Sequence, residues 1–168
     1  MTKKIIFTTG GTGGHILPAI NLMKHFFDKG YTVLLVTDQR GKNFVKDFYE
    51  FKTYVLKADS PTNKNLYKKL LSLIIIFFSI FKSIVILKKE KPDLIFGMGG
   101  YVSFPVSFAS NFFKLPLIIY ENNMVLGRAN KFLSSFSKKI LVANKISDNF
   151  SIQIKFANGS IGTVHYFS

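Results

Sequence analysis

Two glycine clusters and one acidic segment contain the residues of this sequence that could do chemistry. The first cluster reads GGTGGH at residues 10–15 and follows a short apolar run. Glycine lets the backbone turn tightly and leaves its N–H groups uncovered, and a helix that begins here points the positive end of its dipole at the loop. We therefore expect the loop to bind an anion such as a diphosphate; a tight turn without a ligand is the alternative.

A dinucleotide-binding fingerprint is another interpretation of this loop, since Asp38 ends the next predicted strand at about the right distance. In the register that begins at Gly11 and Gly13, however, Ile16 stands where the third glycine belongs. This mismatch disfavours a nicotinamide-dependent oxidoreductase.

His15 lies at the edge of the loop, where its imidazole could take a proton from a hydroxyl held near the phosphates. The alternative is a hydrogen-bonding role at the start of the helix. The other histidines, His25 and His165, are too far away in the sequence to suggest a metal cluster.

The second cluster reads GMGGYVS at residues 97–103 and again lies where a predicted strand gives way to a helix. Two glycine loops at the carboxyl ends of strands in one sheet would face a common cleft. Tyr101 and Ser103 offer hydroxyls to a sugar or a phosphate, although either could simply cap the helix.

The acidic segment reads YENNMVLGRAN at residues 120–130. Glu121 is the only acidic residue between Asp93 and Asp148, and it falls at the end of a predicted strand. A carboxylate and several amides at this place suit the recognition of sugar hydroxyls. In the alternative, Glu121 pairs with Arg128 and only fixes the loop.

Short apolar runs alternate with helical patterns along the chain. We predict strands at residues 4–9, 32–37, 54–57, 93–96, 117–120 and 139–143, and helices at residues 16–28, 65–90, 104–113 and 126–136. Uniformly apolar strands that alternate with helices indicate a parallel sheet covered on both faces. The expected fold is an α/β domain with a Rossmann-like, doubly wound parallel sheet. One further strand is expected at residues 151–156, and none after it.

The stretch at residues 70–87 is almost entirely apolar and is flanked by lysines. Lys82 interrupts it, and a transmembrane span would place two halves of one sheet on opposite sides of a bilayer, so we reject a span. Apolar side chains cover every direction around this helix, more than one core face requires. We favour a ridge that inserts partly into an anionic leaflet over a buried helix, with Ile75, Phe78 and Lys82 in contact with the membrane.

The composition sets limits on other functions. The formal net charge is +14 with a pI near 9.9, but only Arg40 and Arg128 among the basic residues are arginine, and no nucleic-acid-binding module is visible. The chain has no cysteine, so disulfides and thiolate metal sites are excluded. The first residues do not resemble a secretory signal, and we expect the protein at the cytoplasmic face of the membrane.

The three motifs together resemble the signature of the MurG family of undecaprenyl-diphospho-muramoylpentapeptide N-acetylglucosaminyltransferases, in the same order and spacing. The resemblance covers nearly the whole chain. It implies the N-terminal domain of a GT-B glycosyltransferase. The implied reaction is inverting: the 4-hydroxyl of the N-acetylmuramic acid on the undecaprenyl diphosphate carrier attacks UDP-N-acetylglucosamine, and UDP leaves without help from a metal or other cofactor.

The resemblance also implies roles for individual residues. His15 and Glu121 would handle the proton of the acceptor hydroxyl. The positions that would contact the substrates are Thr12, Gly13, Gly14, Gly99, Gly100, Tyr101, Ser103, Asn123 and Asn130. The family usually has His before the glutamate and Gln after it, whereas this chain has Tyr120 and Asn122.

The end of the sequence departs from the family pattern. We expect residues 1–157 to form the acceptor-binding and membrane-binding domain and residues 158–168 to be an atypical tail, with no donor-binding domain. The chain would then transfer no sugar alone, and a separate C-terminal half could complete it. A non-catalytic membrane-anchoring subunit of a two-polypeptide glycosyltransferase remains the alternative function.

Overall fold

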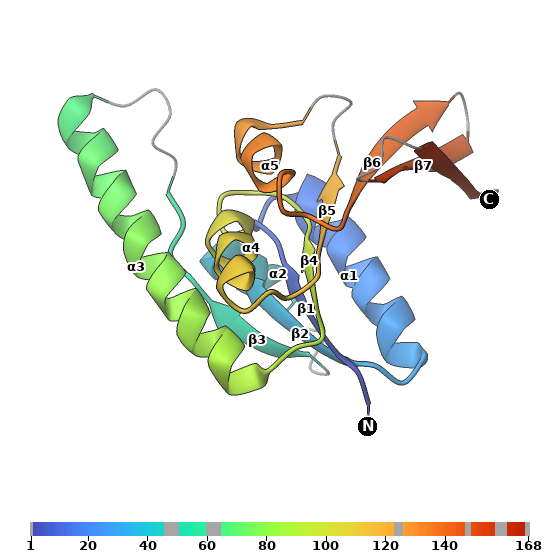
Figure 1. Ribbon diagram of the computed structural model, residues 1–168, viewed down its shortest axis with the longest axis horizontal. Coiled ribbons are helices and arrows are strands. Elements are labelled where there is room, and N and C mark those ends of the chain that lie inside the picture. The colour runs from blue at the N-terminus through green and yellow to red at the C-terminus, as the bar shows by residue number, and fades with distance from the viewer. Residues whose placement is uncertain are drawn as a thin grey trace.

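The computed structural model describes residues 2–45, 51–59, 65–122, 126–146, 149–156 and 161–166. Its strands and helices alternate from the N-terminus as far as β6 (Figure 1). The elements are, in order, β1 (Lys4–Thr8), α1 (Gly13–Asp28), β2 (Thr32–Thr37), α2 (Gln39–Phe44), β3 (Lys52–Val55), α3 (Leu66–Glu90), β4 (Leu94–Gly97), α4 (Ser103–Phe112), β5 (Leu117–Glu121), α5 (Arg128–Leu133), β6 (Lys139–Ile146), β7 (Asn149–Phe156) and β8 (Ile161–Tyr166).

All described strands belong to one sheet, in the order β3-β2-β1-β4-β5-β6-β7-β8. Strands β1 to β6 are parallel, and the order reverses beside β1, so the predicted doubly wound, Rossmann-like fold is confirmed. This order places the loops after β1 and β4 next to each other, and the loop after β5 beside them. The three motifs of the sequence therefore meet at one edge of the sheet.

The structure corrects the expectation for the end of the chain. Strand β7 runs antiparallel to β6, and β8 runs antiparallel to β7, so the sheet is mixed rather than wholly parallel. The expectation of no strand after residue 156 was wrong, because β8 spans Ile161–Tyr166. Helix α2 was also missed: it is only six residues long and has no apolar period, and its start depends on Asp38, whose carboxylate accepts a hydrogen bond from Gly41 N at 2.8 Å.

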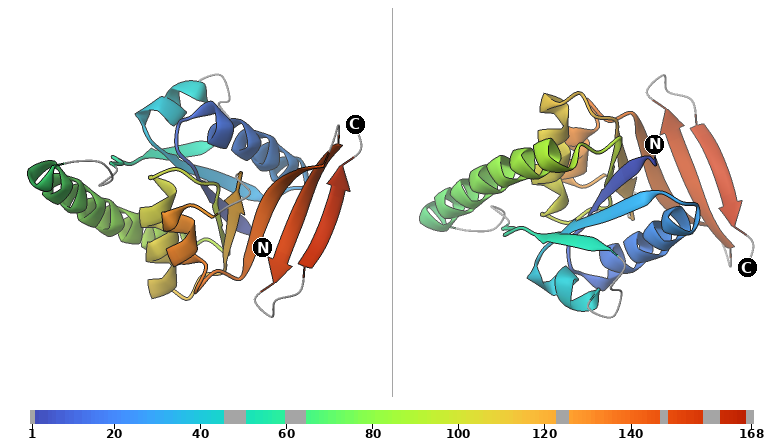
Figure 2. Two further views of the ribbon diagram at one scale, coloured as in Figure 1. Left: turned by 90° about the horizontal axis from the view of Figure 1, so that it is seen from above. Right: turned by 90° about the horizontal axis from the view of Figure 1, so that it is seen from below.

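Two cores lie on opposite faces of the sheet (Figure 2). On one face, Ile16 and Met23 of α1 pack against Phe7 of β1 and Phe96 of β4. On the other face, α3, α4 and α5 cover Ile6. Both faces of the central strands are therefore buried, as their uniformly apolar sequence predicts.

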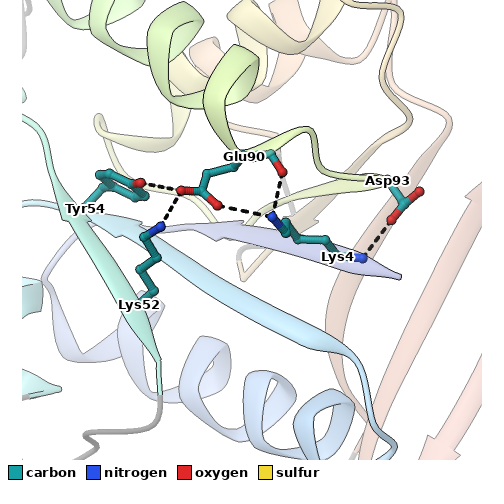
Figure 3. Close-up of polar contacts among 5 residues, drawn as sticks. All are labelled: Lys4, Lys52, Tyr54, Glu90 and Asp93. Carbon is teal, nitrogen blue, oxygen red and sulfur yellow. Dashed lines mark hydrogen bonds and ion pairs between the residues drawn. The ribbon is translucent and has the colours of Figure 1, made fainter. Parts of the chain in front are cut away.

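Glu90 fixes the C-terminal end of α3 to the sheet (Figure 3). Its carboxylate is 6% exposed and accepts hydrogen bonds from Lys52 Nζ at 2.6 Å, Lys4 Nζ at 3.2 Å and the Tyr54 hydroxyl. Lys4 Nζ also donates to the Glu90 carbonyl at 2.7 Å, and Lys4 N donates to Asp93 Oδ2 at 2.7 Å. A single helix end is thus joined to β1 and β3.

The environment of Glu90 makes this junction sensitive to acid. Burial by itself raises the pKa of the Glu90 carboxyl, but the hydrogen bonds from Lys52, Tyr54 and Lys4 outweigh burial and lower the pKa from 4.5 to about 2. A depressed pKa in the folded state means that the carboxylate stabilises the fold above pH 4.5. This contribution is lost as the pH falls from 4.5 through about 2.

We predict that Glu90→Gln lowers the free energy of unfolding by about 2 kcal/mol at pH 7, because it removes the charge that the two lysines contact. The difference from the wild type should shrink as the pH falls from 5 towards 2. Urea unfolding at several pH values measures both quantities. Asp28→Asn, at an exposed carboxylate of α1, is the control and should change stability by less than about 0.5 kcal/mol. A Glu90→Gln effect that does not depend on pH would contradict this account.

Candidate functional site

The two glycine loops contact each other at the carboxyl ends of β1 and β4. Gly10 N donates a hydrogen bond to Gly99 O at 2.9 Å. A Cβ on Gly100 would lie 2.7 Å from Gly10 Cα, and Gly100 has a φ of +80°, which L side chains rarely adopt. Side chains at these positions would force the loops apart.

The first loop is also confined on its other side, by the start of α2. A Cβ on Gly11 would overlap Gly41 N and Asp38 Oδ1. Gly10, Gly11 and Gly100 are therefore needed for packing between backbones rather than for exposure to a ligand.

Gly13 and Gly14 differ from these glycines because they face open space. Among the residues that the structure describes outside this helical turn, no atom lies within 4 Å of a Cβ on Gly13, and only Asn122 Nδ2, at 3.7 Å, lies that close to a Cβ on Gly14. Both residues lie in the first turn of α1, where backbone N–H groups have no partner within the helix. Thr12 precedes them as an exposed N-cap residue whose side chain makes no capping hydrogen bond. Uncovered N–H groups and the helix dipole together favour an anion here.

The ring of His15 lies against the second loop. A Cβ on Gly99, which has a φ of +89°, would approach His15 Nδ1 to 2.8 Å. Nδ1 is buried and has no hydrogen-bond partner among the described residues. His15 thus joins the two loops at the place where the sequence predicts a proton acceptor, and its role in catalysis stays a prediction.

Glu121, predicted to handle a proton, and Asn130, predicted to contact a substrate, contact each other. The Glu121 side chain is 3% exposed, and its Oε2 accepts hydrogen bonds from Asn130 Nδ2 at 2.9 Å and from Gly127 N at 3.1 Å. These bonds tie the end of β5 to the start of α5. Glu121 thus fixes this loop, as in the alternative interpretation, but through Gly127 and Asn130; among the described residues it forms no ion pair with Arg128, which lies exposed. A catalytic role for Glu121 stays a prediction.

Three predicted substrate contacts remain: Tyr101, Ser103 and Asn123. Tyr101 is about half exposed at the edge of the second loop and is available to a ligand. Ser103 is buried, and its hydroxyl donates to Gly100 O at 3.0 Å, so the alternative of a structural role at the start of α4 fits better. Asn123 lies outside the described residues.

Asn122 is the residue of this edge that sequence reasoning missed as a contact of α1. The sequence marked Asn122 as one of several amides and as a departure from the family pattern, and the period of two along β5 places alternate residues on opposite faces of the sheet. Tyr120 belongs to the core beneath α1, and Ile119 belongs to the opposite core. Asn122 follows Tyr120 by two residues and approaches Gly14, whereas Glu121 contacts α5.

Metal ligands do not gather at this edge. In the ranges that the structure describes, no group of three or more His, Asp or Glu side chains could hold a metal ion. The candidate site therefore consists of backbone N–H groups, His15, Tyr101 and Asn122.

Helix α3 turns small polar residues inward and large apolar residues outward. Ser72, Ser79 and Ser83 are buried; the hydroxyl of Ser79 donates to Lys57 O at 2.7 Å and that of Ser83 to Ser79 O at 2.7 Å. The outer side chains are largely exposed, with Phe78 at 60% and Phe81 at 62%. An amphipathic helix in water shows the reverse pattern.

The predicted membrane contacts lie on this outer surface, which we call the α3 ridge. It comprises the exposed side chains Leu70, Leu71, Leu73, Ile74, Phe77, Phe78, Phe81 and Val85. Lys82 lies exposed among them, and Ile75 is only partly exposed. By length and composition alone α3 could cross a membrane. Its two ends, however, join β3 and β4 of one sheet (Figure 1), so a span would separate strands that belong together.

The chain is similar in sequence to known glycosyltransferases. The family model described as "Glycosyltransferase family 28 N-terminal domain" matches residues 5–142. Two curated relatives are both named UDP-N-acetylglucosamine–N-acetylmuramyl-(pentapeptide) pyrophosphoryl-undecaprenol N-acetylglucosamine transferase. The one from Pelagibacter ubique is 39% identical over 92% of this chain and 43% of its own length. The one from Rickettsia bellii is 35% identical over 91% of this chain and 42% of its own length.

Solved structures agree with the fold. The crystal structure of Acinetobacter baumannii MurG superposes with a TM-score of 0.75 at 27% identity, over 85% of this chain and 42% of that chain. The S. aureus MnaA–UDP structure superposes with a TM-score of 0.63 over 84% of this chain and 38% of that chain, and at 16% identity it shows the fold alone. The chain thus spans about two-fifths of the length of the relatives that it matches.

The steric difference between the glycines generates a stability prediction. Gly100→Ala should lower the free energy of unfolding by at least about 2 kcal/mol, because alanine is strained at positive φ and its Cβ overlaps Gly10. Gly13→Ala should not lower it, since the site is open and alanine favours a helix. Thermal or urea unfolding of the two variants measures the difference. Equal destabilisation by both would show that the loops are not packed as described.

Proposed function

The chain belongs to the glycosyltransferase family 28 N-terminal domain family, and we propose a function on that basis. The chain would form the acceptor-side half of an N-acetylglucosaminyltransferase of peptidoglycan synthesis. The complete reaction transfers N-acetylglucosamine from UDP-N-acetylglucosamine to an undecaprenyl-diphosphate-linked muramoyl-pentapeptide, the step from lipid I to lipid II. The observation that carries the proposal is the uncovered first turn of α1, framed by two glycine loops in contact. The names of the relatives at 35% and 39% identity support the choice of substrates.

The site suits a diphosphate better than a neutral ligand. Both proposed substrates carry a diphosphate, and the N–H groups of Gly13 and Gly14 can donate to its oxygens without a side chain in the way. Backbone donors that are fixed before the ligand arrives stabilise negative charge without reorganising. The same donors would stabilise the charge that develops on the leaving UDP.

The 4-hydroxyl of the acceptor sugar must lose its proton to a base as its oxygen attacks the anomeric carbon and the bond to UDP breaks. His15 is the better candidate, because its ring lies at the contact of the two loops beside the open turn of α1, whereas the Glu121 carboxylate is buried and accepts hydrogen bonds from Gly127 and Asn130. Glu121 would act as a positioning residue that holds α5 against β5 through Gly127 and Asn130. Neither role requires a metal or another cofactor.

The α3 ridge supports a location at the cytoplasmic face of the membrane. A lipid-linked acceptor presents its diphosphate at the surface of the bilayer, so the enzyme must approach that surface. The exposed apolar side chains of α3 can enter the acyl boundary, and the flanking lysines and net charge of +14 favour anionic lipid. The ridge would equally serve a non-catalytic anchoring subunit, and diphosphate binding distinguishes the two functions. A separate C-terminal half, and inactivity of the chain without one, stay predictions.

We predict that Gly13→Val abolishes diphosphate binding while the domain stays folded. The branched side chain would fill the space of the ligand, and its Cβ would lie more than 4 Å from every described atom outside the first turn of α1. Titration calorimetry with UDP-N-acetylglucosamine and with farnesyl diphosphate should show at least a tenfold loss of affinity, about 1.4 kcal/mol.

Asn21→Val is the matched control, because it places the same side chain on the exposed face of α1 beyond the first turn. It should bind like the wild type. A folded Gly13→Val chain with unchanged affinity for both ligands would rule out this site.

We further predict that Phe78→Glu with Phe81→Glu releases the chain from vesicles that contain anionic lipid. The two changes remove apolar side chains from the α3 ridge and add two negative charges that the surface repels. Co-sedimentation with vesicles measures binding. Lys24→Glu, on an exposed face of α1, changes the net charge by the same amount without touching the ridge and should release much less protein. Retention of the phenylalanine variant would contradict membrane contact through α3.

A further inference from the structure

A polar side chain directly after β5 reaches the open turn of α1. Asn122 Nδ2 lies 3.7 Å from the position of a Cβ on Gly14, and among the described residues outside the first turn of α1 no other atom lies within 4 Å of that position. The Asn122 side chain is exposed, so this amide group borders the space in front of Gly13 and Gly14. A carboxamide nitrogen is a donor, as are the backbone N–H groups beside it.

Tyr120 restrains the orientation of that amide. The two residues are on the same face of β5, and the Tyr120 hydroxyl donates a hydrogen bond to Asn122 Oδ1 at 3.4 Å. Tyr120 is 4% exposed, and its ring is held in the core with Ile16, Ile20 and Phe96. An oxygen that accepts from a fixed hydroxyl leaves the nitrogen of the same carboxamide directed elsewhere.

The hydroxyl of Tyr120 is well suited to this donation. Burial, together with the neighbouring Glu121 carboxylate, raises the pKa of Tyr120, so that its hydroxyl keeps its proton at neutral pH. The carboxylate itself accepts hydrogen bonds from Gly127 and Asn130 on the other face of the sheet. Alternate residues of β5 therefore support different parts of the same edge.

We propose that Asn122 donates a hydrogen bond from Nδ2 to a phosphate oxygen of the diphosphate bound at the first turn of α1, and that Tyr120 is the positioning residue that aims this amide. The inference rests on the proposed function, since it assumes a diphosphate at Gly13 and Gly14. The proposal adds the amide of Asn122 to the backbone donors of Gly13 and Gly14. Both Tyr120 and Asn122 stand at positions where the family usually has other residues. The shared chemistry is the diphosphate, whether it comes from a nucleotide sugar or from a prenyl carrier.

The test compares the affinities of four variants of the full chain for UDP-N-acetylglucosamine and for farnesyl diphosphate. Asn122→Asp keeps the shape but replaces the donor with an anionic oxygen, and it should weaken binding about tenfold or more. Asn122→Ala removes the donor and should weaken binding several-fold. Tyr120→Phe should cause a smaller loss, and none when it is added to Asn122→Ala, because the amide that it positions is then absent.

Asn21→Asp is the matched control, since it adds the same charge on the exposed face of α1 away from the first turn, and it should change affinity less than twofold. If the Asn122 variants weaken the binding of only one of the two ligands, the diphosphate of that ligand occupies the first turn of α1. Wild-type affinity of Asn122→Asp, or full additivity of Tyr120→Phe with Asn122→Ala, would overturn the inference. If Gly13→Val still abolishes binding in that case, the diphosphate site stands and only the role of Asn122 and Tyr120 is wrong. If the wild-type chain binds neither ligand, both the proposed function and this inference are contradicted.

Discussion

The close contact between the two glycine loops is the constraint on which the rest of the site depends. Gly10 and Gly100 approach so closely that neither backbone leaves room for a Cβ. A hydrogen bond of 2.9 Å from Gly10 N to Gly99 O holds the two loops together. With the loops held in this way, the start of α1 lies beside the loop that follows β4. The first turn of α1 is left open at the edge of the sheet, with His15 against the second loop. The proposed anion site is thus a consequence of backbone packing, and within the first loop Gly13 and Gly14 are the glycines that would meet a ligand.

Helix α3 has an outer surface that suits the proposed contact with a membrane. The side that faces the domain carries Ser72, Ser79 and Ser83, which are bonded to neighbouring oxygens, and near the C-terminal end Ile86 and Leu87, which enter the core. These contacts and the ionic contacts of Glu90 hold the helix, and the bulky apolar residues of the α3 ridge point outward instead of into the core. This arrangement would be unfavourable in water alone, because it exposes a contiguous apolar surface. A lipid surface removes that cost, and the fold and the proposed location support each other.

Much of the fold could be predicted from the sequence because uniformly apolar strands and amphipathic helices have different periods. The elements that were missed depend on contacts instead: α2 begins at the Asp38 carboxylate, and β8 is paired only with β7. The three motifs lie together at the carboxyl ends of β1, β4 and β5, as the sequence predicted. They did not distinguish packing glycines from open ones, nor reveal that Glu121 is bonded to Asn130, because both facts depend on how distant segments approach each other.

The most direct test of the account is an NMR titration of the ¹⁵N-labelled chain with UDP-N-acetylglucosamine and, separately, with farnesyl diphosphate. The amide N–H groups of Gly13 and Gly14 point into the proposed diphosphate site, so their signals should shift most and at the lowest ligand concentrations. Signals from the packed Gly10 and Gly100 should move less, and those from the far end of α1 should not move. Saturable shifts confined to other parts of the chain, with Gly13 and Gly14 unaffected by both ligands, would contradict the claim that the first turn of α1 binds a diphosphate.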